Sequence, residues 1–283
     1  MQLITWNIQW ARGADGVVDP ARIIRVCREM ADFDVLCFQE VARNFPGLAG
    51  NGGADLFAQL AAQLPGFAHV EGIAVDALGP GGPRRQFGVV VFSRLPVVQS
   101  FRHLLPWPAD RGVPSMQRVA VEAVIAGARG PLRVTTTHLE YYSARQRAAQ
   151  VESLRALHAE ATGHAADIPV PKKDGGPFET RPRPRSAILT ADFNLTPDDP
   201  LHARLQAPIA GAPAYRDAWR IRHPSTAHAP TRGLYDKAQW PGAPDCCDFI
   251  FVTEDLAGRI EDVIVNAETK ASDHQPVLLR LAD

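Results

Sequence analysis

The chain has 283 residues, of which 46% are hydrophobic and 22% charged. This balance is typical of a soluble globular protein with a sizeable core and excludes an intrinsically disordered chain. Lys and Arg together number 30 against 31 acidic residues, so no overall positive field attracts a polyanion, and nucleic-acid binding would need a local basic groove.

The start of the chain, MQLITWNIQW, has no basic segment and no apolar run of signal-peptide length. No apolar stretch of 18 residues occurs anywhere, so we expect a cytoplasmic protein without stable membrane association. The length is compatible with one catalytic domain over residues 1–283, which we expect to be a monomer.

The four cysteines form no CxxC pair and have no histidine at zinc-finger spacing. We therefore expect reduced thiols in the core rather than a disulfide or a metal site. They are Cys27, Cys37, Cys246 and Cys247.

Short apolar or alternating runs predict strands along the whole chain. The runs are 2–6, 34–39, 67–75, 87–92, 119–125, 132–137, 187–191, 248–252, 260–265 and 276–281. Helical patterns cover 20–31, with Pro20 in the first turn; 54–64; and 143–162, where Ser143 can cap the helix. Strands outnumber helices by about three to one, which favours sheets packed face to face with helices outside.

Two stretches rich in proline and glycine, 79–85 and 163–185, are predicted loops. The second is basic, but Phe178 is its only aromatic residue, so we interpret it as a solvated insertion rather than a nucleic-acid arm. The helix before it must return the chain to the opposite edge of the sheet. We therefore expect the insertion to lie far from a site at the carboxyl ends of the strands.

Polar residues end four of the predicted strands abruptly and a polar segment precedes the last one, at positions where a strand can hold a functional group rigidly and a loop leaves room for substrate. These ends are Thr5-Trp6-Asn7, Gln39-Glu40, Thr137-His138, Asp192-Phe193-Asn194 and the segment Ser272-Asp273-His274-Gln275-Pro276.

In chain order, TWNIQ, DVLCFQE, GVVVFSR, THL, ADFN, DFIFV and SDHQP resemble the motifs of the endonuclease/exonuclease/phosphatase superfamily. That superfamily includes deoxyribonuclease-I-like nucleases, abasic-site endonucleases, bacterial sphingomyelinases and inositol-polyphosphate 5-phosphatases. The resemblance spans residues 3 to 281. It implies an α+β fold, a four-layer α/β sandwich in which helices flank two packed mixed β-sheets, with the site at one edge.

The resemblance also implies a metal-dependent hydrolase of phosphate esters that uses Mg²⁺ or Mn²⁺. The metal ligands would be Asn7, Glu40 and Asp273, with Glu40 the foremost, and hard oxygen donors of this kind suit magnesium. The ion would neutralise a phosphate oxygen and the charge that develops on the leaving group.

Asp192 matches the family residue that orients or deprotonates the attacking water, and Asn194 matches the amide that holds the water or the scissile phosphate. At alternate strand positions the two would point to the same side. His274 matches the histidine that contacts the phosphate oxygens, and Asp248 matches its carboxylate partner, which would fix the tautomer and raise the pKa of the ring.

His138 and Arg118 are the expected substrate-binding residues together with Asn194. Histidine at position 138 favours the nuclease and sphingomyelinase branches, because abasic-site endonucleases have tyrosine there. Gln9 stands where those endonucleases have an acidic metal ligand, which also disfavours DNA repair. Arg118 could pair with a carboxylate or a phosphate, or lie on the surface.

The loops 43–54, 79–87, 103–117 and 211–245 are expected to form the rim that selects the substrate. Their aromatic and cationic residues could stack a base and hold phosphates, or accept a lipid headgroup or a sugar phosphate. They are Trp107, Arg111, Tyr215, Arg216, Trp219, Arg232, Tyr235 and Trp240. No long hydrophobic hairpin is evident, which disfavours a sphingomyelinase.

Three functions remain open. The first is a phosphodiesterase acting on nucleic acid or a smaller diester, and the second is a phosphomonoesterase of inositol- or nucleotide-type phosphates. The third is a catalytically silent relative that binds a phosphorylated partner. The sequence retains the expected metal ligands and both histidines, which favours an enzyme.

Overall fold

The structure is a computed structural model that describes residues 1–167 and 170–282. Its strands form two six-stranded mixed sheets. The first sheet has the order β11-β12-β1-β2-β4-β3 and consists of Ile260–Val265, Val277–Leu281, Gln2–Asn7, Val35–Arg43, Arg84–Ser93 and Ala68–Leu78. The second has the order β5-β6-β7-β8-β10-β9 and consists of Val97–Leu104, Val119–Gly127, Gly130–His138, Ala187–Asp192, Asp248–Thr253 and Tyr215–Asp217.

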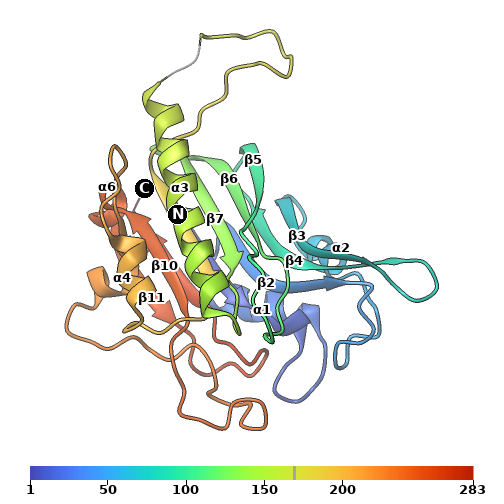
Figure 1. The fold of residues 1–283 in the computed structure, drawn as a ribbon. Helices are drawn as coiled ribbons and strands as arrows, with labels where there is room; N and C mark the ends of the chain where they lie inside the picture. Colours follow the sequence, from blue (N-terminus) through green and yellow to red (C-terminus); the bar gives the residue numbers. More distant parts are fainter. Residues whose placement is uncertain (168–169, 283) are drawn as a thin grey trace.

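Helices cover the outer faces of this pair of sheets (Figure 1). On the first sheet lie α1 (Pro20–Met30) and α2 (Leu56–Ala62), and on the second lie α3 (Ala144–Ala166) and α4 (Pro200–Gln206). Each of these four helices begins at a residue type that favours the N-cap position. The cap side chain accepts a hydrogen bond from a backbone N–H in the first turn, and the caps are Asp19, Asp55, Ser143 and Asp199. The shorter helices are η1 (Gln9–Ala11), α5 (Ala218–Arg222) and α6 (Glu254–Ala257).

Three apolar layers hold the elements together. Strand side chains alternate between the faces of a sheet, so Leu3 packs between the two sheets while Ile4 packs under α1. Val121 and Ile250 join Leu3 in the central layer, and Phe251 faces α4. The four-layer sandwich of two mixed sheets flanked by helices is therefore confirmed.

All ten predicted strands and all three predicted helices are present, with ends that shift by a few residues. The sequence missed β5, an edge strand whose residues are all half-buried or exposed, and β9, which has only three residues. It also missed α4, α5 and α6, since none is longer than seven residues and so none shows a helical period.

The predicted insertion follows α3, which extends to Ala166 and so beyond the predicted end at 162. Residues 168–169 of the insertion lie outside the described part of the chain. Its remaining residues lie at the top of Figure 1, at the end of α3 opposite to His138 at the carboxyl end of β7. The prediction that the insertion lies far from the carboxyl ends of the strands is therefore confirmed for its described residues. No helix in the described residues is long and apolar enough to cross a membrane.

The strand register brings the polar strand ends to one edge. Parallel pairing aligns Asn7 with Gln39, at the end of β1, and His138 with Asp192, at the ends of β7 and β8. Antiparallel pairing places Asp248, the first residue of β10, opposite Asp192. The carboxyl ends of β1, β7 and β8 and the start of β10 therefore surround one location, whereas β2 continues past Gln39 and Glu40 to Arg43, so the strand end predicted at Glu40 is wrong.

Candidate active site

A pocket of about 270 Å³ opens at this edge. Seven of the predicted site residues line it, namely Glu40, Arg118, His138, Asp192, Asn194, Asp273 and His274. The other two, Asn7 and Asp248, lie directly behind and are bonded to lining residues. The sequence therefore predicted the members of this cluster, although their roles remain predictions.

Glu40 lies where β2 is distorted. The register of β2 against β4 shifts between Phe38 and Val41, and Glu40 has a φ of 59°, in the left-handed region that non-glycine residues seldom adopt. Such strain is concentrated at functional sites. Burial and the nearby Asp273 raise the pKa of Glu40 to about 7.

The carboxylates of Glu40 and Asp273 suit a hard cation. Both line the pocket, and their mutual repulsion is one cause of the raised pKa of Glu40. A bound divalent ion would relieve that repulsion, and oxygen donors are the ligands that Mg²⁺ and Mn²⁺ prefer. Asp273 is held in place because Oδ2 accepts hydrogen bonds from Gln239 Nε2 at 3.0 Å and Trp240 Nε1 at 2.9 Å.

Asn7 connects two carboxylates. Its Nδ2 donates to Glu40 Oε1 at 3.1 Å and to Asp192 Oδ2 at 2.9 Å, while its Oδ1 accepts the backbone N–H of Gln9. These contacts favour a positioning role for the amide. Its predicted role as a metal ligand would require the oxygen to exchange that backbone partner for the ion.

Asp192 ends β8, and Asn194 reaches the pocket through a turn rather than through strand alternation. Asn194 has a φ of 51° and its backbone N–H donates to Asp192 Oδ1 at 3.0 Å. The expected alternate-strand placement of the two side chains is therefore wrong, because the strand stops at Asp192. Asn194 Nδ2 donates to Leu139 O at 2.9 Å and approaches His138 Nε2 at 3.0 Å.

His274 lies between two carboxylates. Its Nδ1 donates to Asp248 Oδ2 at 2.8 Å, and its Nε2 lies 3.7 Å from Asp192 Oδ2. Burial opposes a charge on this ring, but Asp248, Asp192 and Asp273 raise the pKa of His274 to about 10. The imidazole is therefore protonated at neutral pH, and the predicted partnership with Asp248 is present.

Asp192 remains ionised in this environment. Burial opposes its charge, but the neighbouring histidines and the amide of Asn7 lower the pKa of Asp192 to about 2. His274 is the histidine that carries charge at neutral pH, because burial and the nearby Arg118 lower the pKa of His138 to about 3.

Two buried donors in the pocket wall make no hydrogen bond among the described residues. Since Asn194 Nδ2 donates to His138 Nε2, the neutral His138 ring carries its proton on Nδ1, and this atom lies 3.9 Å from Glu40 Oε1, beyond hydrogen-bond distance. Arg118 pairs with Glu140 through Nε at 3.2 Å, while its Nη1 is likewise unpartnered. Unsatisfied buried donors are costly, so both point to a ligand with acceptor oxygens.

Cys247 adjoins this cluster. Ligand atoms of Asp192, Cys247, Asp248 and His274 lie within 4.8 Å of one another, an arrangement that could hold a metal ion. We interpret it instead as a hydrogen-bonded relay, because His274 Nδ1 is occupied by Asp248, and burial and Asp248 raise the pKa of the Cys247 thiol well above its usual value. As predicted, all four cysteines are buried and free.

The rim differs from the prediction. Tyr215 is buried in β9 with its ring 4.4 Å from that of His158, and Arg216 and Trp219 lie beside it in β9 and α5. These three do not line the pocket, because β9 pairs with the end of β10 that is remote from Asp248. Trp107 and Arg111 do not line it either.

The aromatic rings that do line the pocket are Trp10, Phe87, Tyr141, Tyr142 and Trp240. Trp240 was predicted on the rim, and the sequence offered a signal for three of the others. Trp10 follows Asn7 closely, and the two tyrosines come three and four residues after His138. Their approach to the pocket depends on turns, including positive φ at Gln9 and Trp10, which no motif indicated.

Arg232, predicted on the rim, lies deeper. Its Nε and Nη2 donate to Asp245 at 3.0 and 2.7 Å, and its guanidinium lies 4.6 Å from the Trp240 ring. Its Nη1 donates to Asn194 Oδ1 at 3.3 Å. This contact fixes the orientation of the Asn194 amide and brings a positive charge close to Asp192.

Solved structures share this architecture. An endonuclease/exonuclease/phosphatase from Beutenbergia cavernae aligns with a TM-score of 0.65 and 25% identity over 100% of this chain and 72% of that one. One from Bacteroides vulgatus aligns with a TM-score of 0.70 and 19% identity over 99% and 98%. A 3′ phosphatase from Neisseria, bound to product DNA hairpin, aligns with a TM-score of 0.63 and 20% identity over 100% of both chains. No curated protein matches the chain.

The sequence profile of one family matches residues 4–274, which include every predicted site residue. Together with the two packed mixed sheets and the strand-end pocket, this match identifies the chain as a member of the endonuclease/exonuclease/phosphatase family.

Proposed function

We propose that the protein is a divalent-metal-dependent phosphodiesterase. The observation that carries the proposal is the convergence, in one pocket, of an ionised Asp192, a protonated His274 and the paired carboxylates of Glu40 and Asp273. Carboxylate oxygens and a fixed cation that share one cavity suit a phosphoryl group and an attacking water.

Glu40 and Asp273 would hold Mg²⁺ or Mn²⁺, which when bound would neutralise charge on the phosphate and on the leaving oxygen. His274 would donate Nε2–H to a phosphate oxygen, and Asp248 would keep its ring charged and oriented. The unpartnered Nδ1 of His138 and Nη1 of Arg118 would donate to the remaining oxygens.

Asp192 would orient the attacking water. A carboxylate whose pKa is about 2 is a weak base, so its main contribution is to align the water and to stabilise the imidazolium of His274. Asn194, fixed by Arg232 and Leu139, would hold the water or the scissile phosphate from the other side.

The direct test is turnover of bis-p-nitrophenyl phosphate, DNA, RNA and phospholipids in the presence of Mg²⁺ or Mn²⁺. We expect EDTA-sensitive cleavage of at least one diester, and Glu40→Gln should require a higher metal concentration for half-maximal rate. Faster release of inorganic phosphate from nucleotide or inositol monoesters would assign a phosphomonoesterase instead. Absence of metal-dependent turnover on all of these substrates would reject an enzyme and favour a silent phosphate-binding relative.

A further inference from the structure

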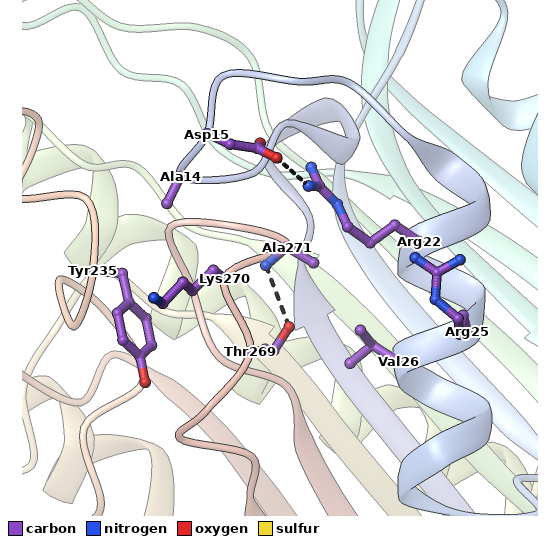
Figure 2. Close-up of a pocket in the computed structure, with 9 residues that line it drawn as sticks. All are labelled: Ala14, Asp15, Arg22, Arg25, Val26, Tyr235, Thr269, Lys270 and Ala271. Carbon is purple, nitrogen blue, oxygen red and sulfur yellow. Dashed lines mark hydrogen bonds and ion pairs between the residues drawn. The ribbon is translucent and has the colours of Figure 1, made fainter.

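A second hollow, larger than the catalytic pocket, lies between α1 and the segment that precedes Asp273 (Figure 2). Its volume is about 570 Å³, within the range of small-molecule sites. Arg22, Arg25 and Val26 of α1 form one wall, and Tyr235 and Lys270 stand on the other side (Figure 2). None of these residues lines the catalytic pocket.

The walls are tied together by hydrogen bonds. The backbone N–H of Ala14 donates to Lys270 O at 2.9 Å, and the hydroxyl of Tyr235 donates to Ala267 O at 2.9 Å. Arg22 is fixed because Nη1 pairs with Asp15 at 2.6 Å and Nη2 donates to Val17 O at 2.7 Å. The hollow is therefore framed by bonded segments rather than by free loops.

Positive charge is in excess there. The lining contains three cations and one carboxylate, Asp15, which already forms an ion pair with Arg22. The other two cations are Arg25 and Lys270. In the described part of the chain the guanidinium of Arg25 has no hydrogen bond or ion pair, and the ammonium of Lys270 contacts only the ring of Tyr235, at 5.1 Å. The Nε of Arg22 is buried without a partner.

The remaining lining suits an organic phosphate. Val26, Ala14 and Ala271 supply apolar surface, and the hydroxyl of Thr269 is polar. Two uncompensated cations around a partly apolar hollow favour a ligand that carries a phosphate group on a small organic body.

The hollow and the catalytic pocket share two segments. Lys270 precedes the pocket residue Asp273 by three positions, and Tyr235 belongs to the same loop as Gln239 and Trp240. Those two side chains hold Asp273 by hydrogen bonds. Lys270 and Tyr235 of the hollow therefore belong to the same segments as Asp273 and the two side chains that hold it.

We propose that this hollow is a second phosphate-binding site, which accepts a phosphate group other than the one cleaved. The group could belong to a substrate with more than one phosphate or to a free phosphorylated anion. The inference that the substrate supplies this phosphate rests on the proposed function, whereas the inference that the hollow binds a phosphate does not.

Binding is tested with pyrophosphate as the probe, by calorimetry at low salt with EDTA present. The test variant is Arg25→Gln with Lys270→Gln, and the matched control is Arg28→Gln, an exposed arginine of the same helix outside the hollow. We expect affinity to fall about ten-fold in the double variant and to stay unchanged in the control. Equal affinity in all three proteins would overturn the proposal, whether or not the enzyme shows turnover.

The source is tested by kinetics on bis-p-nitrophenyl phosphate and on a thymidine dinucleotide with and without a 5′-phosphate. If the substrate supplies the second phosphate, the 5′-phosphate should raise kcat/KM about ten-fold in the wild type and not in the double variant, while the small diester is cleaved equally by both. Pyrophosphate binding that the double variant loses, without a kinetic advantage from the 5′-phosphate, would support the site and assign it to a free anion.

Discussion

Two clusters of histidine and aspartate, one at the strand-end pocket and one around Asp217 of β9, differ in surroundings more than in geometry. In the catalytic cluster His274 lies 2.8 Å from Asp248 and 3.7 Å from Asp192. In the other, Asp217 Oδ2 lies 3.0 Å from His202 Nε2 and 2.6 Å from His228 Nε2. Both are groups that could hold a metal ion by residue type and spacing.

The catalytic cluster opens to a pocket of about 270 Å³ with unpartnered donors in its wall. The Asp217 cluster adjoins a cavity of only about 10 Å³, and its histidine rings pack on Phe249 and Trp219. Asp217 also caps α5 by accepting the N–H groups of Trp219 and Arg220. We therefore expect the same side chains to serve chemistry where a strand end meets solvent, and stability where aromatic rings enclose them.

The largest effect that separates the clusters is expected from Asp192→Asn, which keeps the shape of the side chain and removes its charge. The kcat for a diester substrate should fall about 10³-fold, because the water loses its orienting carboxylate and His274 loses a counter-charge. Steady-state kinetics measures this, with Asp198→Asn, an exposed neighbour in sequence, as the control. A kcat equal to that of the wild type would remove Asp192 from the mechanism.

The converse change, Asp217→Asn, should reduce stability instead. Removing one partner of a buried charged cluster costs about 3 kcal/mol. Urea unfolding measures this loss, while kcat per folded molecule should stay close to wild type. Asp76→Asn, which breaks an exposed pair with Arg84, is the control and should change stability little. A loss of kcat without a loss of stability would make the two clusters equivalent and refute the distinction.

A smaller effect is expected from Arg232→Gln, which tests how the catalytic cluster is held from outside. Losing the bond to Asn194 and the charge near Asp192 should lower kcat about ten-fold. Arg216→Gln is the matched control, since this arginine was predicted on the same rim but does not line the pocket. If both variants behave alike, Arg232 does not position Asn194.

The smallest effect is expected in the pH dependence of stability at acidic pH. Burial opposes the charge of Asp217, but hydrogen bonds from His202 and His228 hold the pKa of this carboxyl well below its usual value. A depressed folded-state pKa contributes stability above the unfolded pKa of about 3.9, and this contribution is lost as the pH falls below it. The stability difference between wild type and Asp217→Asn should therefore shrink as the pH falls from 5 toward 2. A difference that is constant over that range would contradict this assignment.

The sequence indicated the catalytic cluster because its members end apolar runs, and a strand end appears as an abrupt change from apolar to polar residues. Asp217 ends a strand of only three residues, and His202 and His228 come from a short helix and a loop, so no sequence pattern connected the three. The absence of a sequence pattern for turns and short elements also explains why several rim residues were predicted wrongly. Tyr215 is buried and Tyr141 is exposed. Turns decide this difference, and their backbone angles leave little trace in the composition of the sequence.

The pairing of β1 with β12 has a consequence for folding. Trp6 Nε1 donates to His274 O across 268 positions of sequence, and Ser272 Oγ donates to Asn7 O across 265. Contacts between such distant segments form late, because a long loop must close before they stabilise anything. We therefore expect the strand-end pocket to assemble during synthesis only after the segment from Ser272 to Leu281 has left the ribosome.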